Sequence, residues 1–481
     1  MKNTYFVALL LCMGMALSSS AKGYHIHLKM PGVKDSMVFL AHYYGKALPT
    51  IYKTDSAKFD KNGNAEFNSE DPAFVGGIYM MLLSDNKTYF EFLLNSGDEM
   101  SITAPIGKIP EGVKFKNSPE NERFQEYSAF LKKFQEGQKV IEKEYKEAKT
   151  KEDTAAARKK ANATSKDLSN YRAAYSKKYP GTLLGNIFSA LQVPQVPEGD
   201  HYLEDGKTKD STFAYRYYKA HYWDGFDFRD DRLIYTPIYD AKLDEYMNKF
   251  VLPWPDSVEH ESDLLLKKTK GTKDMFKYTL WWVTRNAETS KVMGMDEAFV
   301  YLVENYFMKG DAFWLDSKEL NEYTDRAQKI APNVIGNVAP EIKVQNIITK
   351  KEESMSAIKA RYTLIVFYSP NCGHCQHEMP GLDSLYREVL KKKDVKIMTI
   401  ATEGDEKAIT DFIKKYNMGD WINCWDPEHL GDWRGKFDVY STPTIYLLDE
   451  KKIIRGKRLD HHNIGSLINM LEKKEKDKDK S

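Results

Sequence analysis

The chain has 481 residues, of which 42% are hydrophobic and 29% are charged, and its 71 basic residues are balanced by 70 acidic ones. This composition is typical of a globular protein, and the length indicates about three domains at roughly 150 residues each. The net charge of +1 argues against nucleic acid as a partner, because phosphate binding needs a strongly basic face.

The first residues have the pattern of a secretory signal. Lys2 provides a positive start, residues 5–17 an apolar core, and residues 19–21 a small-residue cleavage site. The apolar run is shorter than the about 20 residues that cross a bilayer. Cys12 lies deep inside this run and after three leucines, which disfavours a lipid anchor. We therefore predict a signal peptide at 1–21 and an exported protein.

Residues 22–117 have the pattern of β-structure. Apolar residues alternate with polar ones from Tyr24 to Met30, which is the period of a half-buried strand. The Asn62-Gly63 pair is a strong signal for a hairpin between the strands on either side. We predict a small antiparallel β domain, a sandwich or a barrel, without a convincing catalytic set.

Residues 118–331 have the pattern of α-helices. Apolar residues recur at three- and four-residue steps from Phe124 to Ala148, and a more polar helix follows as far as Tyr179. The two helices predict a long hairpin, which could dimerise the chain. Residues 215–233 are rich in aromatic side chains, and core packing is favoured over a binding surface there.

Residues 332–475 alternate between strand and helix patterns. Residues 363–369 are a continuous apolar run suited to a central parallel strand, and a helix follows from Cys375 to about Leu390. The pattern predicts an α/β domain with a sheet covered on both faces, followed by a charged tail at 476–481. The predicted fold class is thus multidomain, with an antiparallel β domain, an α-helical domain and a C-terminal α/β domain.

Beyond the signal peptide the chain has three cysteines, Cys372, Cys375 and Cys424, which is too few for a disulfide-stapled scaffold. Cys372 and Cys375 form a Cys-x-x-Cys pair. Haem attachment would need histidine directly after the second cysteine, where Gln376 stands. A static disulfide across so short a loop would remove little entropy from the unfolded chain.

A zinc site would have to use Cys372, His374, Cys375 and His377. Structural zinc sites normally draw their second ligand pair from a separate segment, because neighbouring side chains cannot easily close a tetrahedron. We therefore expect neither a metal nor an organic cofactor.

A redox-active pair explains the position of the two cysteines best. At the first turn of a helix, unpaired N–H groups and the helix dipole stabilise a thiolate. We predict that Cys372 attacks a disulfide and that Cys375 resolves the mixed disulfide. His374 is expected to stabilise the thiolate further, which would raise the reduction potential above the roughly −270 mV of thioredoxin. Gly373 keeps the approach open for a polypeptide substrate.

The segments FYSPNCGHCQHEMP and YSTPTIYLLD resemble the thioredoxin fold and, within it, the exported TlpA/ResA-like thiol–disulfide oxidoreductases. The resemblance covers about residues 332–474. It implies a redox-active disulfide between Cys372 and Cys375, and a helix kink at Pro380. It also implies a cis peptide bond at Pro443, preceded by Thr442, beside which the backbone of a substrate pairs as an added strand.

Glu378 lies three residues after Cys375, hence one helical turn away on nearly the same face. It is a candidate general base for the buried thiol, a role that the resemblance also implies, and a solvent-facing glutamate is the equal alternative. Val366 replaces the buried aspartate of thioredoxins, which favours Glu378, and Asn371 replaces their tryptophan. Cys424 is predicted to be a buried small residue, with a regulatory thiol as the alternative.

The resemblance implies an enzyme of the periplasm or cell envelope of a Gram-negative bacterium. It would reduce disulfides in protein substrates and be recharged by a membrane electron donor of the DsbD/CcdA type. One alternative is a disulfide isomerase or oxidase that acts as a dimer, suggested by His374 and the helical hairpin. Another is a non-enzymatic envelope-binding protein with a vestigial thioredoxin domain. A peroxidase fits poorly, since Ile365 stands where its upstream proline is expected.

Overall fold

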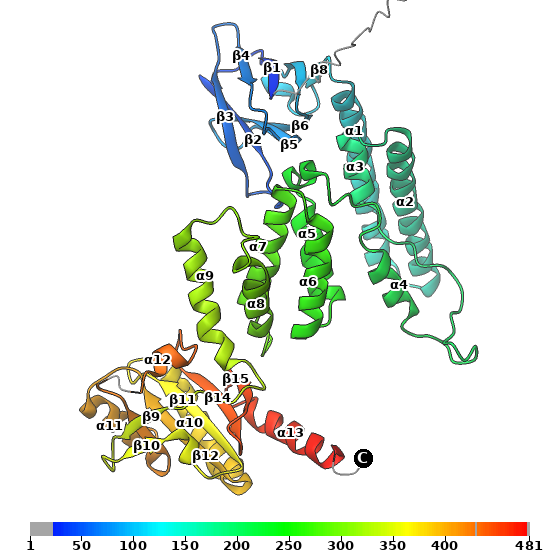
Figure 1. The fold of residues 1–481 in the computed structure, drawn as a ribbon. Helices are drawn as coiled ribbons and strands as arrows, with labels where there is room; N and C mark the ends of the chain where they lie inside the picture. The colour runs from blue at the N-terminus through cyan, green and yellow to red at the C-terminus, as the bar shows by residue number, and fades with distance from the viewer. Residues whose placement is uncertain (1–22, 429–430, 479–481) are drawn as a thin grey trace, which may run out of the picture. The chain divides into compact units, whose positions relative to one another are not determined.

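The computed structural model describes residues 23–428 and 431–478 (Figure 1). The predicted signal peptide, with Cys12, lies outside the described residues. The chain divides into two compact units: the first runs to Tyr246 and includes Gly271–Met275, and the second comprises Met247–Lys270 and the chain from Phe276 onward. The helical region is shared between the units, and the domain limits given above stay predictions.

The N-terminal strands form two four-stranded sheets, in the orders β4-β1-β7-β8 and β3-β2-β5-β6. They are β1 (Tyr24–Lys29), β2 (Met37–His42), β3 (Tyr52–Lys58), β4 (Asn64–Ser69), β5 (Gly77–Leu83), β6 (Tyr89–Leu94), β7 (Asp98–Thr103) and β8 (Lys114–Lys116). Side chains from both sheets share one core, so the predicted β domain is confirmed. Its neighbouring strands are antiparallel except for β1 and β7, which run parallel.

The Asn62-Gly63 turn is present, but the predicted hairpin is wrong. The Asp60 carboxylate accepts the N–H groups of Asn62 and Asn64, both at 2.8 Å, and Gly63 takes a φ of +73°. The strands on either side nevertheless enter different sheets, since β3 pairs with β2 and β4 pairs with β1. The turn residues specify a local reversal of the chain, whereas the pairing is decided by burial of residues such as Phe67.

The helices of the first unit begin with the predicted hairpin. They are α1 (Pro119–Glu147), α2 (Lys151–Lys178), α3 (Leu183–Ala190), α4 (Phe213–His221) and α5 (Tyr239–Glu245). The Arg172 guanidinium of α2 donates to the Tyr127 hydroxyl of α1 at 2.6 Å, and Gln138 donates to Thr164 at 2.9 Å. These contacts join two antiparallel helices, as predicted.

Aromatic side chains of the segment 215–233 fill the helical array. Tyr222, Phe226 and Phe228 are buried, and Tyr222 packs on the Tyr246 ring with ring centroids 5.3 Å apart. Core packing is therefore confirmed for these three rings, whereas the Tyr215 side chain in the same segment is 42% exposed.

The second unit contains helices ahead of the α/β domain. They are α6 (Pro255–Thr269), α7 (Asp274–Thr289, whose first residues belong to the first unit), α8 (Asp296–Leu302) and α9 (Ser317–Ile330). The Asp263 carboxylate of α6 accepts hydrogen bonds from the hydroxyls of Tyr301 and Tyr306, at 2.6 and 2.7 Å. Among the described residues, no helix is both long and apolar enough to cross a membrane.

The C-terminal domain is a seven-stranded sheet in the order β10-β9-β13-β12-β11-β14-β15. Its strands are β9 (Lys343–Asn346), β10 (Glu352–Ser354), β11 (Tyr362–Tyr368), β12 (Val395–Ala401), β13 (Ile422–Trp425), β14 (Thr444–Asp449) and β15 (Ile454–Lys457), and its helices are α10 (Gly373–Leu385), α11 (Glu406–Lys415), α12 (Trp433–Lys436) and α13 (Ile464–Lys478). The central strand β11 runs parallel to β12 and antiparallel to β14. The predicted α/β fold is thus confirmed, and Pro380 lies inside α10.

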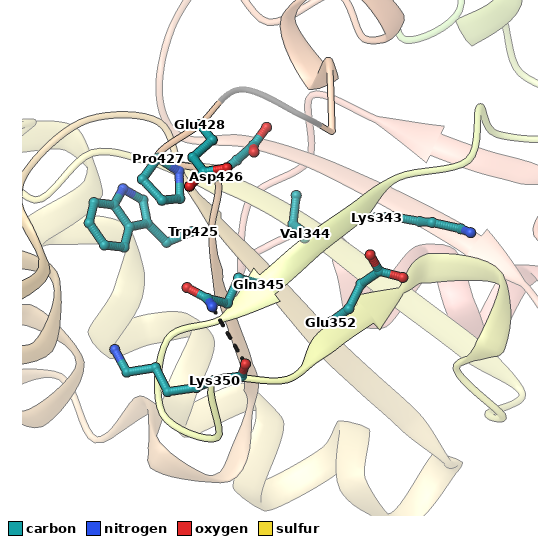
Figure 2. Close-up of a pocket in the computed structure, with 9 residues that line it drawn as sticks. All are labelled: Lys343, Val344, Gln345, Lys350, Glu352, Trp425, Asp426, Pro427 and Glu428. Carbon is teal, nitrogen blue, oxygen red and sulfur yellow. Dashed lines mark hydrogen bonds between the residues drawn. The ribbon is translucent and has the colours of Figure 1, made fainter.

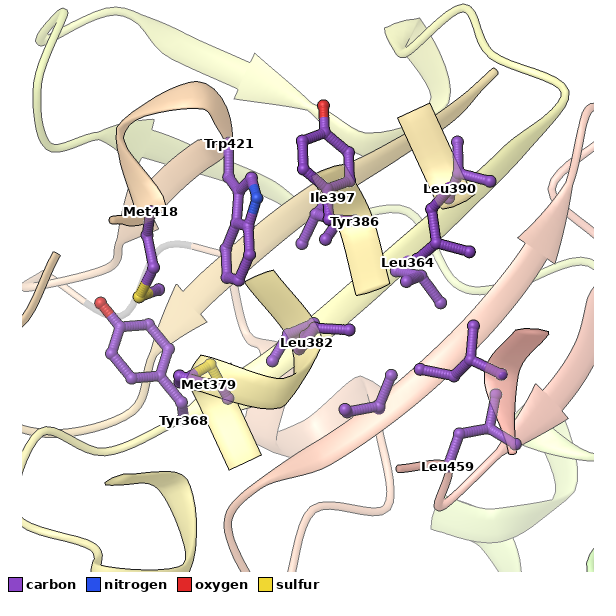
Figure 3. Packing of buried hydrophobic residues seen from close by; sticks show 14 of the residues in the cluster. Leu364, Tyr368, Met379, Leu382, Tyr386, Leu390, Ile397, Met418, Trp421 and Leu459 are labelled. Carbon is purple, nitrogen blue, oxygen red and sulfur yellow. The ribbon is translucent and has the colours of Figure 1, made fainter. Parts of the chain in front are cut away.

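Both faces of this sheet are buried. On one face, Leu364 and Tyr368 of β11 pack with Met379 and Leu382 of α10 (Figure 3). The opposite face holds Ile365 and Phe367 of β11 together with Trp433, Phe437 and Cys424. This two-sided packing explains the continuous apolar run of β11, because alternate residues enter different cores. Cys424 is 1% exposed, which confirms its predicted burial.

Candidate redox site

The loop after β11 places Cys372 at the start of α10. The Tyr368 carbonyl at the end of β11 accepts two hydrogen bonds from Thr402, one from its N–H at 2.8 Å and one from its hydroxyl at 3.1 Å. The buried Ser369 donates its hydroxyl to Glu403 at 3.2 Å. The segment that follows β12 therefore holds the loop, and Cys372 becomes the N-cap of α10.

The two thiols of the motif lie at different depths. Cys372 is half-buried and Cys375 is fully buried, and both are free thiols. The Cys372 sulfur accepts the N–H of Cys375 at 3.4 Å, and its thiol donates to the Thr442 carbonyl at 3.0 Å. One sulfur thus faces the surface while the second lies beneath it.

The environment shifts the pKa values of these thiols in opposite directions. Burial alone would raise the pKa of Cys372, but hydrogen bonds with the Thr442 and Cys375 side chains and with the backbone N–H groups of Cys375 and His374 outweigh it and hold this pKa below its ordinary value. Burial raises the pKa of Cys375 to about 12. The arrangement therefore favours a thiolate at Cys372 and a protonated thiol at Cys375.

The backbone N–H of His374 is among the groups that lower the pKa of Cys372, and stabilisation of the thiolate by its imidazole stays a prediction. The side chain of His374 is exposed, as is Gly373. Apart from its chain neighbours and the backbone of its own helix, no described atom lies within 4 Å of the position that a Cβ would take at Gly373. The start of α10 is therefore open on the side from which a substrate can approach.

The Thr442–Pro443 peptide bond is cis, which agrees with the expectation for this position. A small cavity of about 110 Å³ lies beside it, lined by Glu403, Arg434, Tyr440 and Thr442 among others. The Tyr440 side chain is 64% exposed. An apolar ring and charges of both signs therefore lie next to the carbonyl that contacts Cys372.

Glu378 is not the solvent-facing residue that the sequence left as one alternative. Its side chain is 13% exposed, and its carboxylate accepts the backbone N–H of His461 at 2.5 Å and contacts the His461 Nδ1 at 2.9 Å. The contact of His461 with Glu378 was not predicted from the sequence. The signal that could have found it is the pair of histidines, His461 and His462, just before the last helix.

A further pocket of about 340 Å³ lies at the β9, β10 and β13 side of the sheet (Figure 2). Lys343, Lys350, Glu352 and Trp425 contribute to its lining, so it carries charges of both signs. It contains none of the predicted site residues. Within residues 23–428 and 431–478, no group of three or more His, Cys, Asp or Glu side chains is placed to hold a metal ion.

Comparison with known protein families gives three matches along the chain. Residues 335–457 match the AhpC/TSA family. Residues 24–124 match a domain of unknown function, DUF4369, and residues 147–333 match another, DUF5106. The three matches follow the order of the β, helical and α/β regions.

Individual proteins are similar to part of the chain. The thiol-disulfide oxidoreductase ResA of Oceanobacillus iheyensis is 28% identical over 129 residues, which are 25% of this chain and 65% of that protein. The thioredoxin-like protein YneN of Bacillus subtilis is 29% identical over 124 residues, 25% of this chain and 68% of that one. A crystal structure of a thioredoxin-like protein from Bacteroides caccae covers 58% of this chain and 97% of its own, with 19% identity and a TM-score of 0.45.

The C-terminal region therefore matches the AhpC/TSA family, and the chain is similar over about a quarter of its length to the thiol-disulfide oxidoreductase ResA. The β and helical regions ahead of it match families of unknown function.

Proposed function

We propose that the protein is an extracytoplasmic thiol–disulfide oxidoreductase that reduces disulfides in protein substrates through Cys372 and Cys375. The observation that carries the proposal is the asymmetry of the two thiols. A half-buried sulfur of lowered pKa lies at a helix start, directly above a buried thiol whose pKa is about 12. The Cys372 sulfur is suited to attack a substrate disulfide, and the Cys375 thiol is suited to resolve the mixed disulfide that forms.

The reaction proceeds in two exchanges. The thiolate of Cys372 attacks one sulfur of the substrate disulfide, and the other substrate sulfur leaves as a thiolate. Cys375 then loses its proton and its sulfur attacks the Cys372 sulfur, so that the Cys372–Cys375 disulfide forms and the second substrate thiolate leaves. Two electrons pass from the dithiol to the substrate.

The surface around Cys372 suits a polypeptide. The backbone at Thr442 and Pro443 offers a place for an extended substrate to pair as an added strand, and Gly373 leaves room for it. The exposed Tyr440 ring adds an apolar contact for the residues that flank the substrate cysteine.

Turnover requires an electron donor, because each cycle leaves Cys372 and Cys375 oxidised. A membrane protein of the DsbD/CcdA type is the donor proposed for an exported reductase of this kind. The signal pattern of residues 1–21 supports export to the periplasm or cell envelope of a Gram-negative bacterium.

Trapping of the mixed disulfide tests this assignment. Cys375→Ser should accumulate a covalent complex with a disulfide-containing protein such as oxidised insulin, because no resolving thiol remains. Cys372→Ser should form no complex, since the buried Cys375 is protonated and inaccessible. Equal trapping by both variants would contradict the assigned roles, and no exchange by the wild-type chain would favour a non-enzymatic binding protein.

A further inference from the structure

Glu378 and His461 form a pair of partly buried side chains beside the redox helix. Glu378 lies on α10 one turn after Cys375, and His461 lies in the loop between β15 and α13. The backbone N–H of His461 reaches one carboxylate oxygen at 2.5 Å, and Nδ1 reaches the other at 2.9 Å. Since a carboxylate only accepts, Nδ1 carries the proton in this contact. Held at both oxygens, the Glu378 carboxylate has one fixed orientation.

The helix leaves space for this imidazole. A Cβ at Gly381 would lie 2.4 to 2.6 Å from three atoms of the His461 ring, so the ring rests on the helix backbone where any side chain would displace it. On another side the His462 ring lies 3.8 Å away, centroid to centroid. The Asp460 carboxylate fixes the loop by accepting the N–H groups of His462 and Asn463, at 2.9 and 3.1 Å.

The chemistry of the second exchange calls for a proton acceptor near Cys375. Its thiol is buried and protonated, and it must lose a proton before the sulfur can attack. The neighbouring Val366 side chain has no proton acceptor. Burial, together with the thiols of Cys424 and Cys375, raises the pKa of the Tyr368 hydroxyl, so this group stays protonated. The carboxylate of Glu378 lies one helical turn from Cys375 and can accept this proton.

We propose that His461 is a positioning residue for Glu378 in the second exchange, an inference that rests on the proposed function. The Glu378 carboxylate takes the proton of the Cys375 thiol. The Cys375 sulfur then bonds to the Cys372 sulfur, and the substrate sulfur leaves with the electron pair of the broken bond. The imidazole neither gains nor loses a proton, and its Nδ1–H steadies the carboxylate throughout.

The test separates the two exchanges on the reduced full chain. A symmetric nitro-aryl disulfide releases one coloured thiolate when Cys372 attacks and a second when Cys375 resolves, so the two rates are read from one stopped-flow trace. His461→Leu removes the Nδ1 donor, and His461→Asn keeps an N–H donor without an imidazole. Gly381→Ala displaces the ring while leaving both members of the pair, and Gly465→Ala is its control, because a Cβ there meets only Leu385 at 3.7 Å.

We expect His461→Leu and Gly381→Ala to slow the second release by about tenfold or more while the first stays within about twofold of wild type. His461→Asn and Gly465→Ala should keep the second release close to the wild-type rate. Glu378→Gln should slow it at least as much as His461→Leu, and the double variant should be no slower than Glu378→Gln, because both changes remove the same function.

An unchanged second release in His461→Leu, or an equal slowing of both releases, would overturn the role of His461. A double variant whose loss is the product of the single losses would also overturn it. These results leave the proposed function intact as long as the wild-type chain completes both releases. A wild-type chain that releases no second thiolate would refute the proposed function and this inference together.

Discussion

The central strand of the C-terminal sheet and the α1–α2 hairpin bury their residues to very different degrees. All seven residues of β11 are buried. Of the 29 residues of α1, all of which the structure describes, Asn121 and Tyr127 are buried. The strand ends at the loop of Cys372, so the reactive sulfur is fixed to the best-packed part of its domain. The hairpin has a thin apolar stripe and exposed ion pairs. Because such contacts contribute little stability, each residue of the hairpin is held only weakly by its neighbours.

This contrast predicts that the chemistry depends on a few residues near β11 and α10 and is insensitive to the hairpin. Changes at the site should alter rates, and changes in the core below it should alter stability. Matched changes on α1 should alter neither.

The largest effect is expected for Cys372→Ala. The thiolate is the attacking group, so the rate of disulfide reduction should fall by about 1000-fold or more without a change in thermal stability. The reduction of a protein disulfide, followed by gel shift of the freed thiols, measures this rate. Cys424→Ala is the control at a third cysteine and should keep the wild-type rate. A comparable loss in Cys424→Ala would mean that this thiol takes part in the exchange.

Truncation of an apolar side chain should cost much more unfolding free energy in the core of the C-terminal domain than in the α1–α2 hairpin. Leu382 of α10 is fully buried against β11, and Leu382→Ala should cost about 3 kcal/mol of unfolding free energy. Val140 of α1 is 59% exposed, and Val140→Ala should cost no more than about 0.5 kcal/mol. Urea titrations followed by fluorescence compare the two. Equal costs would show that the hairpin is packed against something that this structure does not contain.

Removal of an exposed aromatic ring should change KM for a protein disulfide only where the ring lies beside the Cys372 site. Tyr440→Ala should raise KM for a protein disulfide by about tenfold, since it removes an apolar contact next to Thr442. The rate with a small aryl disulfide should stay unchanged because such a reagent does not reach that contact. Tyr145 of α1 is 45% exposed, and Tyr145→Ala is the matched change. Equal effects of the two variants would remove Tyr440 from the substrate surface.

The smallest effect is a pH-dependent one in α6. Burial, and then the charges of Glu297, Asp256 and Asp263, raise the pKa of Glu259 from 4.5 to about 7. The folded state therefore holds this proton more tightly than the unfolded state, so stability falls as pH rises from about 4.5 to about 7. Glu259→Gln removes the penalty and should raise Tm by about 2 °C at pH above about 7, with no gain below about 4.5.

The control for this pH effect is Glu147→Gln, at an exposed position of α1. Its Tm should follow that of the wild type at every pH. Scanning calorimetry at a series of pH values measures the Tm of Glu259→Gln and of Glu147→Gln against that of the wild type. A gain in Glu259→Gln that is the same at low and high pH would show that the added amide packs better, and that the charge is not the cause.

The position of Cys372 and Cys375 at the start of a helix and the cis bond before Pro443 could be predicted from the sequence because each signal is local. The cysteine spacing, the apolar run of β11 and the Thr442-Pro443 motif all lie within short segments. The structure adds that the backbone N–H of His374 is among the groups that lower the pKa of Cys372. A contact of the main chain leaves no trace in residue identity.

Contacts between distant segments were the ones that sequence reasoning missed. His461 is 83 residues away from Glu378, and nothing in either local pattern pairs them. The Asn62-Gly63 turn shows the same limit, because a turn signal says where the chain reverses and not which sheet the next strand joins. In both cases the partner is chosen by packing of whole elements, which short patterns do not encode.

The reduction potential of the Cys372–Cys375 couple tests the central claim most directly. The full chain is equilibrated against glutathione buffers of known poise, and the fraction of oxidised pair is read by thiol trapping. A protein-disulfide reductase kept charged by a donor should have a potential near or below about −250 mV. A value near about −150 mV would contradict that account and assign the protein to disulfide oxidation or isomerisation.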